Sequence, residues 1–359
     1  MTYVLTLKPQ APGLTRPQRI LLKIDGERIV DVEYRPDTAT ETALTHAAQF
    51  TPAQLIAAAA QSAPGCGVAH GLALCQAIEL LAGIEVPPRA AFLRVAAAEL
   101  ERASSHAAAV AAILTALGLA SLAEPFTTTD ARLQATLTTL TATEPGDWLI
   151  PGGVGYDSDA SVREVLEQTS VELIAILFPV VDRMLSQRSL LARTVDVGVI
   201  TTHAATQFRL EGPLGRASGL TSDLRIDKPY AAYASLPPER VTQPSGDVYA
   251  RLVVLVLELL ESLKLVGRAS RELPGGEICG ELPERLPASI TNATVEGARG
   301  PITYHVESDG RRLTSVSYRL APQVDRLLTR SLLVNAQVDD AALVFVSTDP
   351  CDTCVETGY

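Results

Sequence analysis

The sequence has few aromatic residues, few cysteines and fewer basic than acidic residues. Aromatic residues make up 4% of its 359 residues, against 47% hydrophobic residues overall, so its apolar surface is mostly Ala, Leu and Val. Lysine and arginine number 30 against 41 acidic residues, and a net charge of -11 argues against nucleic acid as a partner. Five cysteines, an odd number, indicate a reducing compartment and no disulfide framework.

Long apolar runs are also missing. The most apolar segment, LVVLVLELLESLKLV at 252–266, is too short to cross a bilayer and contains Glu258, Glu261 and Lys264. The first residues, MTYVLTLKPQAPGLTRPQR, lack the apolar core of a secretory signal. These absences predict a globular protein that is soluble by itself and reaches a membrane only through something it binds.

Helical periodicity dominates the first third of the chain. Residues 41–118 are rich in Ala and Leu, with a break at Pro64 and a new helix opened by Pro87-Pro88. The stretch from 119 to 149 is looser, and we predict no long helix there. It leads to the Gly/Pro turn IPGGVGYD.

Two further helices are predicted in the second half. One spans 157–189, with a capping box formed by Ser161 and Glu164 and a kink at Pro179. The other spans 247–269, after an irregular region from about 195 to 243. The apolar spacing in these two helices predicts that they form the spine of a bundle.

Alternating patterns near both ends predict antiparallel hairpins. Residues 19–34 turn at Asp25-Gly26, and residues 303–320 turn at Asp309-Gly310. The predicted fold class is therefore mainly α (α+β), a central long-helix bundle with small antiparallel β elements near both termini. We expect one domain over 1–359, divided into a β-hairpin region, a helical core and a β-containing region that ends in a C-x-x-C motif: 1–40, 41–270 and 271–359.

Four residues could form a metal or redox site. Cys351 and Cys354 form a C-x-x-C in DPCDTC, and Cys66 and His70 lie four apart in PGCGVAHG. Thiolates are soft ligands for zinc, nickel or iron–sulfur clusters. A lone C-x-x-C is equally consistent with a redox dithiol or with two ordinary thiols. Cys75, among leucines, is expected to be a buried small hydrophobe, and Cys279 is given no role.

Two polar segments also stand out. Arg299 lies between small residues in VEGARG, which allows close backbone approach while the guanidinium points one way, although a surface turn is the commoner case. The segment EGPLGRASGLTSDLRIDKPYAAY is dense in paired charge. It predicts an interior ion-pair network or an interface, with a solvated loop as the alternative. Its charged residues are Arg216, Asp223, Arg225, Asp227 and Lys228.

Taken together, these motifs resemble the large subunit of NiFe-hydrogenases and the 49 kDa subunit of respiratory complex I. The likeness runs in order through CGVAHGLALCQAIELLAGIEVPPRAAFLRVAAAELERASSHA, IPGGVGYD, RTVDVGVI, GPLGRASGLTSDLRIDKPYAAY, GDVYARLVVLVLELLESL, VEGARGPITYHVESDG and DPCDTC. It covers most of the chain. The length and the C-terminal C-x-x-C are most similar to group 4 energy-converting membrane-bound hydrogenases.

The resemblance implies a Ni–Fe centre whose ligands here are Cys66, Cys351 and Cys354. The family's N-terminal motif is R-x-C-G-x-C-x-x-x-H, which places its second Cys at Cys66 and its His at His70. Its first Cys falls at Ala63 and its Arg falls at Gln61. A methyl group cannot bind nickel, so three of the four thiolates remain.

The resemblance also implies catalytic roles. A terminal thiolate, Cys354, would take the proton, Arg299 would supply positive charge beside the metal, and His70 would be a fourth ligand or a neighbour of the ligands. Asp349 precedes the C-x-x-C as in the family. We therefore expect Cys66, His70, Cys351 and Cys354 to converge, and Arg299 to point into the same pocket and pair with a buried carboxylate or the terminus.

The implied reaction is H2 oxidation or proton reduction, with electrons leaving through an iron–sulfur cluster in a small partner subunit similar to the complex I 20 kDa subunit. Membrane-arm subunits would hold the chain on the inner face of the cell membrane, on the cytoplasmic side. One alternative is a catalytically degenerate scaffold or coupling subunit without nickel. Another is a structural zinc site of three cysteines and His70.

Two departures concern residues near the ends of the chain. Ala11 stands where the complex I motif has a quinone-contacting His, which weakens the case for quinone reduction by that route. Thr357 stands where the hydrogenases have Arg or His. We further expect a permanent partner over the face formed by 64–70, the GPLGRASG loop and the C-terminus, burying on the order of 2,000 Å².

Overall fold

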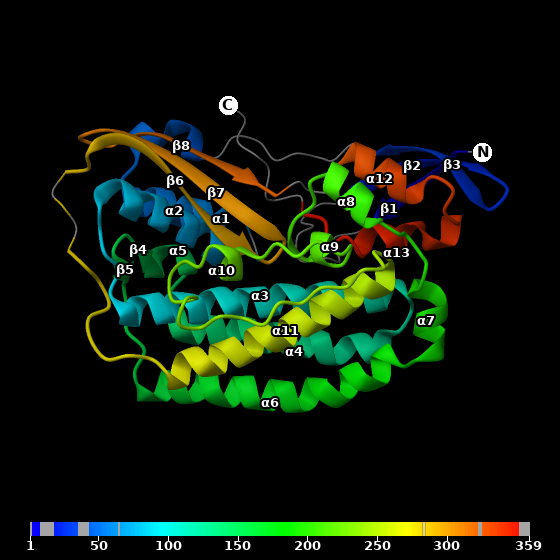
Figure 1. Ribbon diagram of the computed structural model, residues 1–359, viewed down its shortest axis with the longest axis horizontal. Coiled ribbons are helices and arrows are strands. Elements are labelled where there is room, and N and C mark those ends of the chain that lie inside the picture. Colours follow the sequence, from blue (N-terminus) through cyan, green and yellow to red (C-terminus); the bar gives the residue numbers. More distant parts are fainter. Residues whose placement is uncertain are drawn as a thin grey trace.

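The computed structural model describes residues 2–7, 18–34, 43–63, 65–281, 283, 285–321 and 325–351. Ala11, Cys354 and Thr357 lie outside these ranges, so the predictions made for them stay predictions. Figure 1 shows two layers, with long helices below and sheets with shorter helices above. The site described in the next section lies between the layers.

The lower layer is a bundle of four long helices (Figure 1). They are α3 (Pro88–Ala116), α4 (Ala120–Thr141), α6 (Ala160–Leu185) and α11 (Val248–Arg271). Helix α3 packs against both α4 and α11, and α6 packs against α4 and α11. Because α3 is rich in alanine on the buried side, its neighbours approach it closely. The predicted long-helix bundle is confirmed.

The predicted N-termini of these helices agree with the structure in two cases, and the predicted cap differs in a third. Helix α3 begins at Pro88 as predicted, and α11 begins one residue after its predicted start. The predicted capping box of α6 is wrong. The carboxylate of Asp159 caps the helix by accepting the backbone N–H groups of Ser161 and Val162 at 2.8 and 2.9 Å, while Glu164 instead accepts from the Gln168 side chain.

Helix α4 is the one long helix of the bundle that the sequence did not predict. Its segment FTTTDARLQATLTTLT is rich in β-branched threonine, which has a low helix propensity. In the structure the threonine hydroxyls donate to the carbonyl four residues earlier, as Thr138 and Thr139 do at 3.1 and 2.9 Å. Packing on α3 and α6 therefore outweighs the weak local preference.

The upper layer contains a three-stranded antiparallel sheet in the order β6-β7-β8. Its strands are β6 (Ala288–Gly297), β7 (Gly300–Asp309) and β8 (Leu313–Leu320). The predicted hairpin is confirmed, with Gly310 at φ 90° in its turn, and β6 is an additional strand. Helix α2 (Gly67–Ala82) packs against β6 and β7, and α1 (Pro52–Gln61) packs against α2.

A second three-stranded antiparallel sheet lies at the other end of this layer (Figure 1). It consists of β1 (Thr2–Leu7), β2 (Gln18–Asp25) and β3 (Arg28–Tyr34), so the predicted hairpin is confirmed and β1 is added. Helix α12 (Arg326–Leu333) packs against β3. The ring of Tyr34 meets Phe345 edge to face at 5.2 Å between centroids.

Short elements connect the two layers. They are η1 (Ala43–Gln49), α5 (Pro145–Trp148), β4 (Leu149–Ile150), β5 (Gly153–Val154), α7 (Arg188–Thr194), α8 (Thr202–Gln207), α9 (Gly212–Arg216), α10 (Leu224–Asp227), η2 (Val338–Asp340) and α13 (Ala341–Val346). The region from 195 to 243 is otherwise irregular, as predicted. Among the described residues, no helix combines the length and the apolar character that a membrane span requires.

Candidate functional site

Cys66 lies in a tight turn at the start of α2. Its backbone N–H donates to the carbonyl of Ala63 at 2.9 Å, and its own carbonyl accepts the N–H of His70 at 3.0 Å. Both Cys66 and Ala63 are buried, at 3% and 1% exposure. The turn thus places Cys66 at the N-cap position of α2, but its thiol makes no capping bond to the helix.

The thiol of Cys66 instead faces Arg299. The Nη1 atom of Arg299 lies 3.2 Å from the Cys66 sulfur, and its Nη2 atom forms an ion pair with Asp349 at 2.9 Å. Its Nε atom also donates to the Asp349 carbonyl at 3.2 Å. The prediction that Arg299 points toward Cys66 and pairs with a buried carboxylate is confirmed. One guanidinium therefore joins three distant segments of the chain.

The turn that carries Arg299 is held from two sides. Gly212, at φ 63°, lies so close to it that an added Cβ would be 2.6 Å from the Arg299 carbonyl oxygen. From below, Arg102 on α3 donates to the carbonyls of Gly297, at 3.0 Å, and of Glu296. The turn is therefore contacted by the loop that contains Gly212 and by helix α3 of the bundle.

Asp349 has an unusual backbone and an incompletely bonded side chain. Its φ of 49° is in the left-handed region, which is uncommon for a residue other than glycine. Its Oδ1 atom binds Arg299, while its buried Oδ2 atom has no hydrogen-bond partner among the described residues. Buried polar atoms are nearly always hydrogen-bonded, so this oxygen marks Asp349 as a position with a special role.

Cys351 follows two residues later and is half-buried against the core. Because Cys354 lies outside the described residues, the convergence of Cys66, Cys351 and Cys354 stays a prediction. Within the part of the chain that the structure describes, no three His, Cys, Asp or Glu side chains are arranged to hold a metal ion.

A four-thiolate Ni–Fe centre does not fit the residues present. The turn from Ala63 to Cys66 keeps the compact form that brings its first and fourth residues together, but Ala63 offers a buried methyl group at the position of the first thiolate. At most three thiolates are available, and carbon is no ligand.

His70 is accommodated as a core residue. The hydroxyl of Tyr304 lies 2.9 Å from its Nδ1 atom, and its ring meets those of Tyr304 and Tyr318 edge to face. Burial lowers its pKa to about 4, so the ring is neutral at neutral pH. A role for His70 as a ligand or catalytic residue stays a prediction. Cys75 is fully buried, as predicted, and burial raises the pKa of its thiol to about 12.

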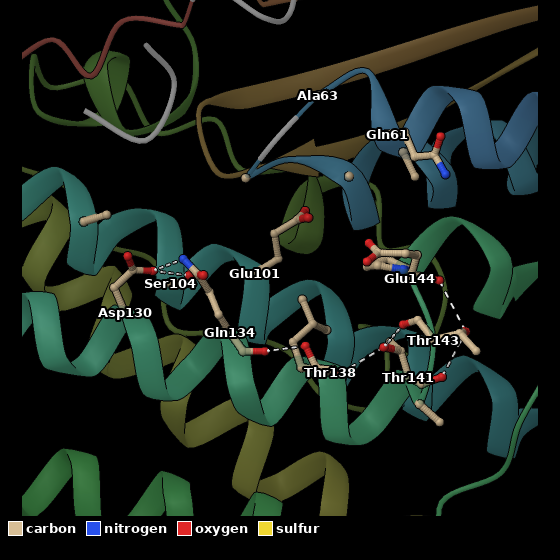
Figure 2. Close-up of a pocket in the computed structure, with 17 residues that line it drawn as sticks. Gln61, Ala63, Glu101, Ser104, Asp130, Gln134, Thr138, Thr141, Thr143 and Glu144 are labelled. Carbon is tan, nitrogen blue, oxygen red and sulfur yellow. Dashed lines mark hydrogen bonds between the residues drawn. The ribbon is translucent and has the colours of Figure 1, made fainter. Parts of the chain in front are cut away.

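Glu101 is a site residue that the sequence analysis missed. It rises from α3 toward the start of α2 (Figure 2), where its two carboxylate oxygens accept the backbone N–H groups of Val68 and Ala69 at 2.6 and 2.9 Å. The available signal was an acidic residue in the buried, alanine-rich segment AAELERAS. Its partner could not be predicted, because the bond spans more than thirty residues.

Glu101 also lines a cavity of about 960 Å³ between α3, α4 and the turn at Ala63 (Figure 2). The wall carries both apolar and polar groups, and the polar ones include a hydrogen-bonded group in which Ser104 and Gln134 donate to Asp130 at 2.5 and 2.9 Å. The lining residues include Gln61, Ala63, Gly65, Gly67, Glu101, Ser104, Asp130, Gln134, Thr138, Thr141, Thr143 and Glu144. We call three lining residues, Gln61, Ala63 and Glu101, together with Cys66 in the adjoining turn, the cysteine wall; Cys66 itself does not line the cavity.

Beneath the site lies a layer of buried, paired charges. We call Glu99, Arg216, Arg225, Glu258 and Glu296 the charged layer; each of them is nearly fully buried. The charged layer joins α3, α9, α10, α11 and β6. The predicted interior network is confirmed for Arg216, Asp223 and Arg225, whereas Asp227 and Lys228 are exposed.

Each member of the charged layer has partners of opposite charge. Arg216 binds Glu258 at 2.6 Å and Glu296 at 2.9 Å. Arg225 binds Glu99 at 3.1 Å, and Glu99 also accepts from Ser262 at 2.6 Å. Burial alone would raise the pKa of Glu258, but Arg216 beside it holds that pKa well below its usual value. The carboxylate of Glu258 is therefore ionised.

The chain matches a protein-family model over residues 145–289, described as "Respiratory-chain NADH dehydrogenase, 49 Kd subunit". One subunit of the NADH-quinone oxidoreductase of Chloroherpeton thalassium is 32% identical, over 97% of this chain and 86% of that protein. Carbon monoxide-induced hydrogenase of Rhodospirillum rubrum is 28% identical, over 99% of both chains. Formate hydrogenlyase subunit 5 of Escherichia coli is 28% identical, over 95% of this chain and 60% of that protein.

Among solved structures, a chain of the membrane-bound sulfane sulfur reductase, an archaeal respiratory membrane complex, has the same fold. The TM-score is 0.89, with 24% sequence identity, over 98% of this chain and 97% of that chain. The likeness extends over both layers, so the bundle and the upper sheets are arranged in the same way in the two proteins.

Proposed function

Because this chain belongs to the family of the 49 kDa subunit of respiratory-chain NADH dehydrogenase, we propose that it is the large-subunit-like component of a membrane-associated, energy-converting oxidoreductase complex. Two relatives over nearly the whole chain are named as a hydrogenase and as a subunit of an NADH-quinone oxidoreductase. The proposed complex is of the kind that these two groups share.

The observation that carries the proposal is the contact of Arg299 with both Cys66 and Asp349. It brings the N-terminal cysteine motif, the VEGARG turn and the DPC segment to one buried place. A guanidinium beside a sulfur stabilises negative charge on it, and the carboxylate of Asp349 fixes the orientation of the guanidinium. Such a site favours chemistry in which a proton or an electron reaches the sulfur or a group bound there.

Two candidate reactions follow. The names of the hydrogenase relatives support H2 oxidation or proton reduction, with Cys66, Cys351 and Cys354 as the available thiol ligands. The methyl group of Ala63 supports the second candidate, a coupling subunit that works without nickel. In either case electrons need a route out of the chain. We propose a small iron–sulfur subunit as the immediate partner and membrane-arm subunits as the attachment to the cell membrane.

The test is purification of the intact complex from membranes through a tag on this chain. Nickel and iron are measured by mass spectrometry, and H2 uptake is measured with an artificial electron acceptor. Stoichiometric nickel with H2 uptake supports the first candidate, and iron without nickel or H2 uptake supports the second. Recovery of this chain as a stable monomer without an iron–sulfur partner would contradict both.

A further inference from the structure

Glu101 caps the N-terminus of α2, a role that ordinarily belongs to the residue at the N-cap position of the same helix. The first N–H groups of a helix have no partner within the helix. Cys66, at the N-cap position, makes no side-chain bond to them. The carboxylate of Glu101 comes from another helix and accepts two of these groups, one on each oxygen, at 2.6 and 2.9 Å. The thiol of Cys66 is thereby left to face Arg299.

The same carboxylate lies on the wall of the open cavity. Glu101 is 8% exposed, and the cavity also carries Asp130 and Glu144 but no lysine or arginine among its described lining residues. A cavity with acidic walls attracts protons and disfavours anions. Glu101 thus has the α2 amides on one side and the cavity on the other.

The charged groups that face Glu101 act in opposite directions. Burial raises the pKa of Glu101 to about 7, while the amides of Val68 and Ala69 and the guanidinium groups of Arg102 and Arg299 lower it. Burial prevails. Arg299 lowers the pKa of Glu101 and also contacts the sulfur of Cys66, so it lies between the two residues' environments.

We propose that Glu101 is a positioning residue that exchanges protons with the cavity, and that each uptake loosens the end of α2 that holds Cys66 beside Arg299 while the carboxyl group of Glu101 itself stays buried. The proposal deepens the proposed function and rests on it only in taking Cys66 as part of the reaction site. In this proposal the position of Cys66 beside Arg299 depends on whether protons reach Glu101 through the cavity.

The exchange step involves a proton and no electrons. Water or hydronium in the cavity gives up a proton, and one carboxylate oxygen of Glu101 gains an O–H bond. That oxygen loses its negative charge, so its bond with the N–H of Val68 or Ala69 changes from a charge-assisted to a weaker neutral bond. Release of the proton to the cavity restores the first state.

The test is amide hydrogen exchange of Val68 and Ala69 in the full chain from pH 5 to pH 9, corrected for intrinsic exchange rates. In the wild type we expect protection of these two amides to fall by about tenfold or more as pH drops through the titration of Glu101, because a charge-assisted bond is lost. The matched variants are Glu101→Gln and Glu144→Gln, which remove the same charge from the same cavity.

Glu101→Gln should abolish this pH dependence, and Glu144→Gln, at an exposed carboxylate, should preserve it. The same pH dependence in Glu101→Gln, or constant protection in the wild type, would overturn the proposal. If Glu101→Gln does not fold, the wild type and Glu101→Asp decide, because the shorter acid should shift the midpoint while keeping a transition. These measurements need neither a partner nor enzyme activity, so failure of the proposed function leaves their outcome readable.

Discussion

The charged layer and the cysteine wall lie next to each other. They differ in how strongly the stability of the fold depends on each side-chain group. In the charged layer every residue has an oppositely charged group within hydrogen-bonding distance, and all of these residues are buried. In the cysteine wall one motif position carries a methyl group, the turn is nevertheless intact, and a cavity opens beside it.

The two regions differ in the free-energy cost of replacing one of their side chains. A buried charge that loses its partner keeps its full desolvation penalty. A thiol that is replaced by a methyl group leaves only a small change of volume, and Ala63 still accepts the N–H of Cys66. The fold can therefore carry alanine at position 63 without losing its architecture.

The largest effect is expected from breaking the charged layer at its centre. Arg216→Met leaves Glu258 and Glu296 buried without their main partner, and we expect a loss of about 3–5 kcal/mol in unfolding free energy, measured by urea denaturation. The matched control is Arg132→Ala, which breaks the exposed pair with Glu172 and should cost at most about 1 kcal/mol. Equal effects would show that the charged layer is not a stability element.

The second-largest effect on stability is expected from Glu101, the buried acidic residue of the cysteine wall. Its pKa of about 7, against a usual 4.5, means that the folded state holds the proton more tightly than the unfolded state. This contribution to stability is fully present below pH 4.5 and is lost as pH rises through 7, by about 3 kcal/mol. The unfolding free energy of the wild type minus that of Glu101→Gln should fall accordingly. A flat difference across this pH range would contradict the assignment.

A third prediction tests whether the cysteine wall lacks only a ligand. Ala63→Cys would place a thiol on the turn with Cys66, so we expect at least about tenfold tighter binding of Ni²⁺ or Zn²⁺, since a thiolate is added to the set. Binding is measured by competition with a chelator. Ala60→Cys, which lines the same cavity outside the turn, is the control and should gain less. Equal gains in both would argue against a preserved ligand position.

The smallest effect concerns α4, the helix on the far side of the cavity from the cysteine wall. Thr139 is exposed and its hydroxyl bonds only back along the helix, so Thr139→Ala should stabilise the protein by about 0.5 kcal/mol. Thr136→Ala should bring no gain, because Thr136 is buried and lies 3.4 Å from the Thr169 hydroxyl. Thermal unfolding of the two variants measures the difference.

Much of the fold was predictable because its elements have strong local signals. The periodic apolar residues of α11 and the Asp-Gly turns of both hairpins are local, and each prediction held. Helix α4 and strands β1 and β6 were missed. Threonine disfavours a helix locally. Strand β6 turns into β7 through Ala298-Arg299, which lacks the Asp-Gly signature of the two predicted hairpins, so tertiary packing decides these elements.

The candidate site was predictable only in part. The resemblance pointed to Cys66, Arg299 and Asp349, and the structure brings these three together. Glu101 was missed because its importance depends on a contact between two helices and on a cavity, neither of which leaves a pattern in the sequence. The same holds for the partners of Arg216, which lie 42 and 80 residues away.

The bond between Arg299 and Cys66 spans 233 residues of chain. During synthesis, the turn that carries Cys66 emerges long before the arginine that faces it, and Asp349 emerges later still. Contacts of such long sequence separation form late in folding, because the intervening chain must first be ordered. The last bundle helix ends at Arg271, so all four helices are synthesised before Arg299, and the thiol of Cys66 meets its arginine only after the chain of the bundle is complete.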